Sequence, residues 1–277
     1  MTLMTLLLTA ITAAGQLSSP FPGPPNHGLV YVIAHRGVHE GIPENTLAAY
    51  AKAIELNVDF VEIDVRETRD GHFVSIHNAT VDAYTDDAQG PVKDFTLAEL
   101  QALDIGSRVG PEWKEESIPT FDSILELCNG KVKIYLDFKQ APLEAVVDRL
   151  RAAGLAESTV WYAGSGPLRT LSKICPECLP MPEVGSGASL DRILKHHAPR
   201  VVASTWASAT EEMVKACHEE GILVFVDDGG PETWQTLFEW GVDGIQTDHV
   251  SGLIEAVKAY SEEAARETVT DQAVGVP

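Results

Sequence analysis

The sequence predicts an α/β fold in which eight strand–helix units close into a (β/α)8 barrel. From residue 29 onward, short runs rich in β-branched residues alternate with helical patterns, without a change of composition that would mark a second domain. Several helical segments end on a glycine, as helices prefer. A length of 277 residues suits one barrel, because such barrels commonly take about 200–250 residues.

Helical patterns such as TLAAYAKAIEL, PLEAVVDRLRAAG, TEEMVKACHEEG and PETWQTLFEWG lie between the apolar runs. Parallel strands joined by helices end at the same face of a barrel, and barrel enzymes place their chemistry at that face. The predicted strands are residues 29–34, 59–64, 131–138, 158–163, 179–184, 200–205, 222–227 and 242–248.

One segment interrupts this alternation after the second predicted strand. There, Asp70-Gly71 stands between two extended runs, and this dipeptide is typical of a two-residue β-hairpin. A turn centred on it pairs Asp64 with His77, which would bring the histidine to the barrel mouth. Residues 78 to about 120 then form an inserted cap segment with one helix, TLAELQAL, before the third barrel strand.

The two ends of the chain are expected to lie outside the barrel of residues 29–264. Residues 1–28 read as a signal peptide and a linker, because a short apolar run ends in small residues near Ala13-Ala14. No Lys or Arg precedes Arg36, so the positive segment of a signal peptide is missing. Export to the periplasm or the exterior is expected, with the cytoplasm as the alternative. Residues 265–277 are expected to be a mobile tail.

The net charge of the chain limits the classes of binding partner that it can be expected to have. The chain has 20 basic and 41 acidic residues, which gives 20 − 41 = −21, and this argues against nucleic acid and anionic membrane surfaces. A small-molecule substrate without a stable membrane span is expected. If that substrate carried a phosphate, arginine, lysine or a divalent cation would have to supply local positive charge.

The four cysteines leave the redox compartment open. Cys175 and Cys178 have the spacing of a tight disulfide loop or of half a zinc site. Zinc is disfavoured because no second pair of ligands accompanies them. Cys128 and Cys217 are expected to be small buried residues.

Acidic residues gather at two predicted strand ends. Glu62 and Asp64 are two positions apart, so in a strand both point to the same face, and the same parity joins Asp137 and Lys139. Carboxylates that converge at one barrel mouth repel one another unless a positive charge lies between them. Oxygen ligands of this kind suit Mg²⁺ or Ca²⁺.

Basic residues at neighbouring positions complete a candidate phosphodiester site. Arg36 offers a planar fork of donors to a phosphate, and Lys139 adds a point charge. His35 and His77 could flank the phosphate, one taking a proton from a nucleophile and the other giving one to the leaving alkoxide.

Each of these signals is weak alone, since a Glu-x-Asp pair can be salt-bridged and most histidines are structural. Their convergence on one face is what favours an active site. A structural role is expected for His39, His72, His196, His197 and His218.

The combination HRG, PENT, VEIDV, T-x-DG…H, TLAEL, D-x-K and GVDGIQTD resembles the glycerophosphodiester phosphodiesterase family over roughly residues 30–255. The resemblance implies a TIM barrel with an inserted cap, a divalent cation, and hydrolysis of glycerophosphodiesters to glycerol 3-phosphate and an alcohol. It implies acid and base roles for His35 and His77, phosphate binding for Arg36 and Lys139, metal ligation for Glu62, Asp64 and Asp137, and a supporting role for Glu44 and Asn78.

Four departures from the family pattern concern the surroundings of this centre. Asn78 stands where the family usually has Asp, and Asp137 stands where it usually has Glu. Residues 83–85 read Ala-Tyr-Thr in place of Arg-Thr-Thr, and residues 226–229 replace a Trp-Thr-x-Asn segment. These changes leave the phosphate and metal centre intact, but they leave the identity of the leaving alcohol undetermined.

Two other functions are compatible with the same residues. A phospholipase D or sphingomyelinase-D-like phosphodiesterase also pairs two histidines with acidic ligands on a related barrel, and can have Asp at the third ligand position. A non-catalytic phosphodiester-binding barrel is the second alternative, and the missing Asp after His77 is the one feature in its favour.

Overall fold

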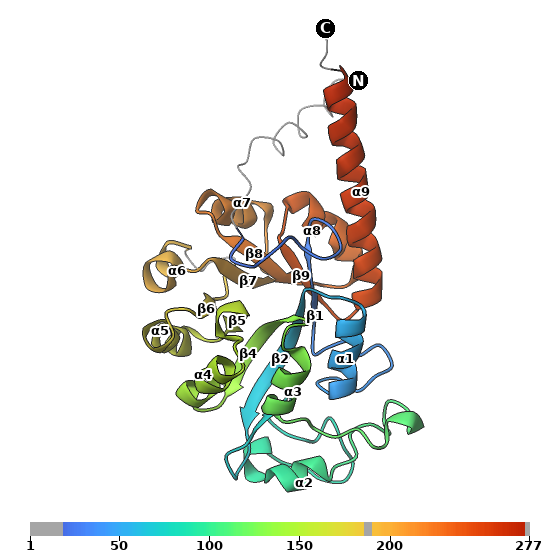
Figure 1. Cartoon of the computed structure of the whole chain (residues 1–277), viewed down its shortest axis with the longest axis vertical. Helices are drawn as coiled ribbons and strands as arrows, with labels where there is room; N and C mark the ends of the chain where they lie inside the picture. Colours follow the sequence, from blue (N-terminus) through green and yellow to red (C-terminus); the bar gives the residue numbers. More distant parts are fainter. Residues whose placement is uncertain (1–18, 186–189, 275–277) are drawn as a thin grey trace.

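The computed structural model describes residues 19–185 and 190–274 and has the predicted barrel at its centre (Figure 1). Parallel neighbours follow the order β6-β5-β4-β2-β1-β9-β8-β7, and β3 pairs antiparallel with β2 outside this path. A parallel bridge between Glu183 and Ala203 joins the two ends of this order, so the barrel is nearly closed. The strands are β1 (Tyr31–Ala34), β2 (Phe60–Glu67), β3 (Phe73–Ser75), β4 (Lys133–Gln140), β5 (Thr159–Tyr162), β6 (Leu179–Met181), β7 (Val201–Thr205), β8 (Leu223–Asp227) and β9 (Gly244–Thr247).

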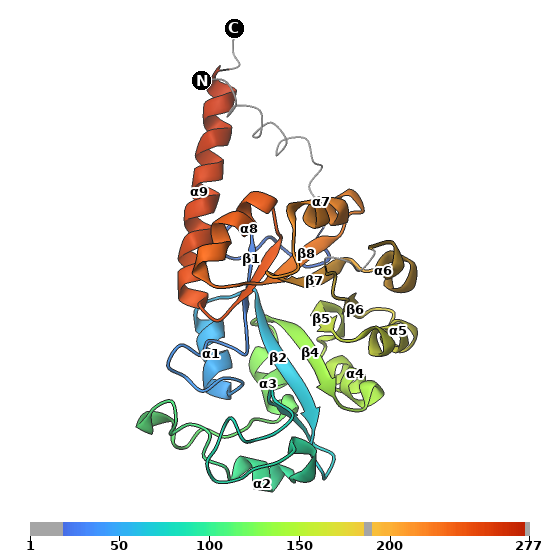
Figure 2. The same cartoon turned by 180° about the vertical axis from the view of Figure 1, so that it is seen from behind.

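Helices surround the barrel strands, as Figures 1 and 2 show from opposite sides. Threonine side chains at Thr46, Thr120 and Thr210 accept hydrogen bonds from the first backbone N–H groups of three of them, which defines where these helices begin. The helices are α1 (Leu47–Glu55), α2 (Leu97–Gln101), α3 (Phe121–Cys128), α4 (Leu143–Ala152), α5 (Ser165–Ile174), α6 (Leu190–His197), α7 (Glu211–Glu219), α8 (Trp234–Trp240) and α9 (Val250–Val274), with short 3-10 helices at Val92–Asp94, Pro111–Trp113, Ala156–Ser158 and Pro231–Thr233.

Alternation along the strands divides the core into two parts. On β1, Tyr31 and Ile33 point into the barrel, whereas Val32 and Ala34 pack against the helices outside. All eight predicted barrel strands overlap an observed one, so the predicted (β/α)8 fold is confirmed.

The predicted linker differs from the structure where it precedes the barrel. Phe21 is buried among the rings of Tyr31, Phe60 and Phe225, which close the amino-terminal end of the barrel. Asn26 is tied to the barrel as well, because its backbone N–H donates to Asp59 Oδ1 at 2.8 Å. Residues 19–28 are therefore part of the packed fold, and residues 1–18, with the predicted signal peptide, lie outside the described residues.

The hairpin after β2 is present, but its predicted register is wrong by one residue. Val65 pairs with Ser75, and Ile76 N donates to Asp64 O at 3.1 Å, so Asp64 lies opposite Ile76 and not His77. The turn holds three residues, 69–71, with Gly71 at φ +82°, in place of the two that were expected. The cap fixes this longer turn, because Asp70 Oδ1 accepts a hydrogen bond from the backbone N–H of Leu97.

Residues 78 to about 120 form the predicted cap segment beside α1 and α3 (Figures 1 and 2). The helix expected there is α2, which Thr96 and Glu99 begin with a reciprocal capping box. Together with Val74 and Ile76, which precede it, the segment forms a separate small apolar core, to which it contributes Val81, Val92, Leu100, Leu103, Ile105 and Ile118.

The carboxyl-terminal end is helical further than its composition suggests. Helix α9 runs away from the barrel and continues through Val274, so residues 265–274 are helical, while their mobility stays a prediction (Figure 1). Within the described residues, no helix combines the length and the apolar character needed to cross a bilayer. Cys175 and Cys178 form a disulfide, and Cys128 and Cys217 are buried free thiols.

Candidate active site at the barrel mouth

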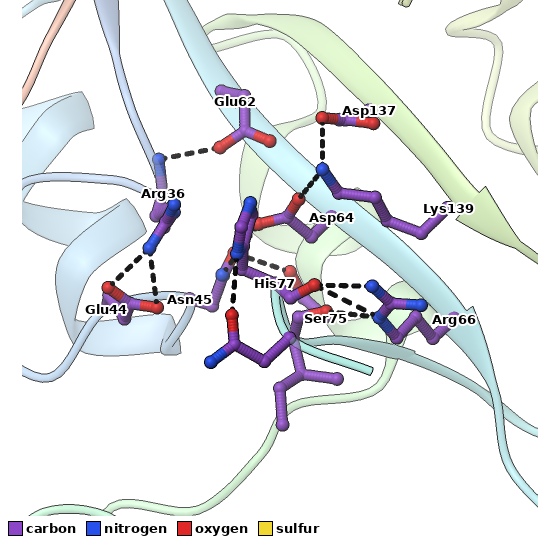
Figure 3. Close-up of polar contacts among 12 residues, drawn as sticks. Arg36, Glu44, Asn45, Glu62, Asp64, Arg66, Ser75, His77, Asp137 and Lys139 are labelled. Atoms are coloured by element: carbon purple, nitrogen blue, oxygen red, sulfur yellow. Dashed lines mark hydrogen bonds and ion pairs between the residues drawn. The ribbon is translucent and has the colours of Figure 1, made fainter. Parts of the chain in front are cut away.

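Strand register brings the three predicted acidic ligands together. In the parallel pair β2–β4, Asp64 lies opposite Asp137, and Glu62 precedes Asp64 on the same face. One carboxylate oxygen from each residue lies within 4.8 Å of the other two. Glu62 and Asp64 are buried, and Figure 3 shows all three side chains directed to one point between the strands.

Burial of these carboxylates makes their negative charge costly. Burial raises the pKa of Glu62 well above its ordinary value, and the neighbouring Asp64 and Asp137 raise it further. Burial also raises the pKa of Asp137, although Lys139 acts in the opposite direction. Burial alone would lower the pKa of Lys139, but Asp137 and Asp64 outweigh it and the pKa is raised. A positive charge placed between these side chains would therefore stabilise their ionised, carboxylate forms.

These residues fit a divalent cation. Lys139 Nζ lies 2.6 Å from Asp137 Oδ2 and 3.2 Å from Asp64 Oδ1. Asp64 Oδ1 is buried and, apart from this ion pair with Lys139, has no hydrogen-bond partner, so it is free to serve as a metal ligand. Three carboxylates on two adjacent strands form the hard oxygen set that Mg²⁺ and Ca²⁺ prefer.

A buried polar network holds the other oxygen of Asp64. Asn45 Nδ2 donates to Asp64 Oδ2 at 2.9 Å, while Asn45 Oδ1 accepts from Tyr50 Oη at 2.7 Å and from Ser75 Oγ at 2.8 Å. Asn45 stands at φ +56°, a conformation that Asn tolerates better than most residues. The sequence prediction gave Asn45 no role at the site, although it lies inside the PENT segment that was noted.

The loop from β1 to α1 shapes the phosphate side of the site. Arg36 adopts φ +53°, and its backbone N–H donates to Glu62 Oε2 at 2.8 Å. Arg36 Nη1 donates to both oxygens of Glu44, at 3.1 and 3.0 Å, so Glu44 contacts Arg36, while its supporting role stays a prediction. Arg36 Nε is buried without a hydrogen-bond partner, so this arginine retains a donor for an anion.

His77 reaches the site although the strand pairing differs from the prediction. The chain leaves β3 after Ser75, and Arg66 holds the turn by donating to the carbonyl oxygens of Ile76, at 3.1 Å, and His77, at 2.6 Å (Figure 3). His77 Nδ1 lies 2.9 Å from Asn78 Oδ1, so the two side chains are in contact, while the supporting role of Asn78 stays a prediction.

His35 is held by a residue that the sequence prediction did not include. Its Nδ1 lies 2.7 Å from Oδ1 of Asp248, which follows β9 directly. Hydrogen bonds from His35 and from His39 hold the pKa of Asp248 far below its ordinary range, so this side chain is a carboxylate throughout the working pH range. The GVDGIQTD run contains Asp248 and was the available signal, because it ends a predicted strand.

Most of the predicted site residues lie in or beside one cavity of about 230 Å³ at the barrel mouth. Several predicted residues line it directly, namely His35, Arg36, His77, Asp137 and Lys139. Glu62 and Asp64 contact the lining residues Arg36 and Lys139, and the supporting residues Glu44 and Asn78 contact Arg36 and His77. The structure thus places all nine predicted site residues in one region.

The cavity wall also includes polar residues that the sequence prediction did not select. Tyr162 Oη donates to Glu183 Oε2 at 2.7 Å, and both side chains line the cavity. Burial raises the pKa of Asp227, which ends β8 near His35. These residues stand at carboxyl ends of strands, the one sequence signal that could have selected them.

The barrel and its mouth together define an enzyme of the phosphoric diester hydrolase class. A family model described as "Glycerophosphoryl diester phosphodiesterase family" matches residues 35–160. A relative from Caldanaerobacter subterraneus subsp. tengcongensis, named glycerophosphodiester phosphodiesterase, is 32% identical over 243 residues, which cover 82% of this chain and 97% of that protein. The chain belongs to the glycerophosphodiester phosphodiesterase family.

Solved structures of similar proteins have the same fold. A glycerophosphodiester phosphodiesterase from Agrobacterium tumefaciens is 26% identical, with a TM-score of 0.74 over 82% of this chain and 99% of that one. An Oleispira antarctica phosphodiesterase, solved in complex with the product sn-glycerol-3-phosphate, is also 26% identical, with a TM-score of 0.75 over 83% of this chain and 96% of that one.

Proposed function

We propose that this chain hydrolyses glycerophosphodiesters to glycerol 3-phosphate and an alcohol in a metal-dependent reaction, with His35 and His77 as acid and base. The observation that carries this proposal is the shared cavity, which is lined by both histidines, by Arg36 and by Asp137 of the acidic cluster. The product named for the Oleispira antarctica relative is the product expected here.

The chain's own residues can hold the substrate and move its protons. Arg36 and Lys139 line the cavity and supply the positive charge that the phosphoryl oxygens of the substrate require. One histidine takes a proton from the attacking water as the new P–O bond forms, and the other protonates the alkoxide of the leaving alcohol as the old P–O bond breaks.

Glu62, Asp64 and Asp137 would hold the cation, which when bound withdraws charge from the phosphoryl group and neutralises the carboxylates. Mg²⁺ and Ca²⁺ both suit this oxygen set. The raised pKa values of Glu62 and Asp137 support a role in which these carboxylates meet a positive charge.

The leaving alcohol is proposed to enter a second cavity, of about 330 Å³, between the β1–α1 loop and the cap. Arg36 and Asn78 connect this cavity to the catalytic one. Tyr84, from the Ala-Tyr-Thr run that departs from the family pattern, lines it together with Arg108. The headgroup preference is therefore expected to depend on the cap.

The reaction is tested with glycerophosphodiesters that carry choline, ethanolamine, glycerol or inositol, with a lysophospholipid as a further substrate. Release of glycerol 3-phosphate, lost in EDTA and restored by Mg²⁺ or Ca²⁺, is expected for at least one glycerophosphodiester. Cleavage of the lysophospholipid alone would favour the phospholipase-D-like alternative. No cleavage at all, with cation bound, would favour a binding protein.

An exported location is proposed as well. The disulfide between Cys175 and Cys178 supports it, because disulfides persist in oxidising compartments. Fractionation of the source cells with mass spectrometry of the mature amino terminus tests this. Intact protein that retains residue 1 in the cytoplasmic fraction would contradict it.

A further inference from the structure

Three side chains meet at one oxygen beside the catalytic cavity. His35 Nδ1 lies 2.7 Å from Asp248 Oδ1, and His39 Nε2 lies 2.9 Å from the same oxygen. A carboxylate can only accept hydrogen bonds, so each ring nitrogen must carry the hydrogen. His35 therefore keeps its hydrogen on Nδ1, which leaves Nε2 to exchange a proton.

The barrel builds this arrangement from strands that are distant in sequence. Strands β1 and β9 are parallel neighbours, with Ala34 opposite Thr247, and His35 N donates to Thr247 O at 3.2 Å. Asp248 is the next residue after this pair. The register of the sheet thus delivers the carboxylate to the catalytic ring.

Asp248 alone is poorly restrained, because its side chain is 54% exposed at the end of a strand. His39 is 22% exposed and anchors the carboxylate from the β1–α1 loop. The hydrogen bond to Asp248 raises the pKa of His39, and Glu44 adds to this, whereas burial and Arg36 act against it. Both the cationic and the neutral form of His39 can donate to Asp248, and the cationic form donates more strongly.

We propose that His39 and Asp248 are positioning residues for His35, with His39 anchoring the carboxylate that fixes the orientation and tautomer of the catalytic ring. This inference rests on the proposed function of His35 as acid or base. The His77 ring has a different partner, because its Nδ1 contacts the neutral amide oxygen of Asn78.

The first test compares His39→Ala with His39→Gln, whose amide can still donate to Asp248. We expect His39→Ala to lower kcat about tenfold through the loss of the anchor, and because His39 also lines the second cavity, a change in KM can accompany this loss. His39→Gln should restore most of kcat. The matched control is His249→Ala, because His249 is adjacent to Asp248 in sequence but is 52% exposed, and its Nδ1 lies 3.8 Å from Oε1 of Glu40. A loss confined to KM, or kcat equal to that of the control, would overturn the proposal.

A double-mutant comparison separates positioning from general damage. If His39 acts only through Asp248, the variant with both His39→Ala and Asp248→Ala should have the kcat of Asp248→Ala alone. If the double variant instead lost kcat by the product of the two single-variant losses, His39 would act by a route that does not involve Asp248.

Nitrogen NMR of the His35 ring supplies a readout that does not need turnover. We expect the hydrogen on Nδ1 in the wild-type chain and a shift of population toward Nε2 in Asp248→Ala. An unchanged tautomer would overturn the positioning role even in an active enzyme. If the wild-type chain turned over no glycerophosphodiester, the proposed function would fail, and the NMR result would still decide whether Asp248 controls the ring.

Discussion

Two histidines face the same cavity, but their second ring nitrogens meet different partners. Asp248, a carboxylate, holds His35, and Asn78, an amide, holds His77. Both partners fix a ring orientation, while only the carboxylate adds a charge. His35 and His77 line the cavity at the open end of the barrel, so neither ring is part of the apolar core.

Replacing His77 by Ala should lower turnover about 10²–10⁴-fold, because a positioned acid or base contributes that much. The free energy of unfolding should change little, since the ring lines a cavity. Steady-state kinetics together with urea unfolding measure both quantities. His72→Ala is the matched control, because His72 is 55% exposed at the hairpin turn, and equal rates for the two variants would remove His77 from the mechanism.

The stability contribution of His39 should depend on pH. Its folded-state pKa is raised above 6.5, so its contribution is fully present below about pH 6.5 and is lost as the pH rises through the folded-state value. The difference in free energy of unfolding between wild type and His39→Gln should therefore be larger near pH 6 than near pH 9. Urea unfolding at both pH values measures this difference. A difference in unfolding free energy that is larger near pH 9 than near pH 6 would contradict the prediction.

At the scale of elements, the β1–α1 loop does most to place the site. Gly37 adopts φ +79°, and a Cβ atom there would lie 2.8 Å from the backbone carbon of Ala49 in α1. The loop therefore packs directly on the helix, which fixes where Arg36 and Asn45 direct their side chains. Only glycine satisfies both the conformation and the contact.

Gly37→Ala and Gly41→Ala form a matched pair, because Gly41 has φ +80° but open space around its Cα. Gly41→Ala should cost about 1 kcal/mol, the strain of a left-handed alanine. Gly37→Ala should cost more and lower activity too, because the loop must move away from α1. Calorimetric unfolding and kinetics measure both effects, and equal effects in the two variants would mean that the contact with Ala49 does not matter.

The hairpin shows why part of the site could not be derived from sequence. A local dipeptide predicted a two-residue turn, whereas contacts with the cap, which lies some 25 residues further along the chain, hold a three-residue turn. The histidine still reaches the cavity because Arg66 binds two backbone carbonyls after the strand ends. Such long-range hydrogen bonds leave no periodic pattern in the sequence.

At the scale of the whole molecule, stability and chemistry lie at opposite ends of the barrel. Aromatic residues and Phe21 fill the amino-terminal end, and polar residues line the carboxyl-terminal mouth. The acidic cluster was predictable because side chains two positions apart on a strand point to the same face. Glu62, Asp64 and Asp137 then come together as soon as their two strands are neighbours. Asp248 and Asn45 were less predictable, because their partners depend on which strands and loops meet in the closed barrel.

Phe21→Ala tests this division. Loss of a buried phenylalanine should cost about 3–5 kcal/mol of unfolding free energy, because the neighbouring rings cannot fill the cavity. The kcat of the folded variant should equal that of wild type. Leu29→Ala serves as the control, since Leu29 is 58% exposed in the same segment, and a lowered kcat in folded Phe21→Ala would contradict the separation.

The central claim is that the acidic cluster holds the cation on which turnover depends, and cation titration of EDTA-treated wild type and Glu62→Gln tests it most directly. Binding by calorimetry and release of glycerol 3-phosphate should follow the same curve in wild type. Glu62→Gln should need at least about tenfold more Mg²⁺ or Ca²⁺ for both, because a charged ligand is lost while the acceptor for Arg36 N–H remains. Identical curves for the two proteins, or full release by the EDTA-treated wild type, would contradict the claim.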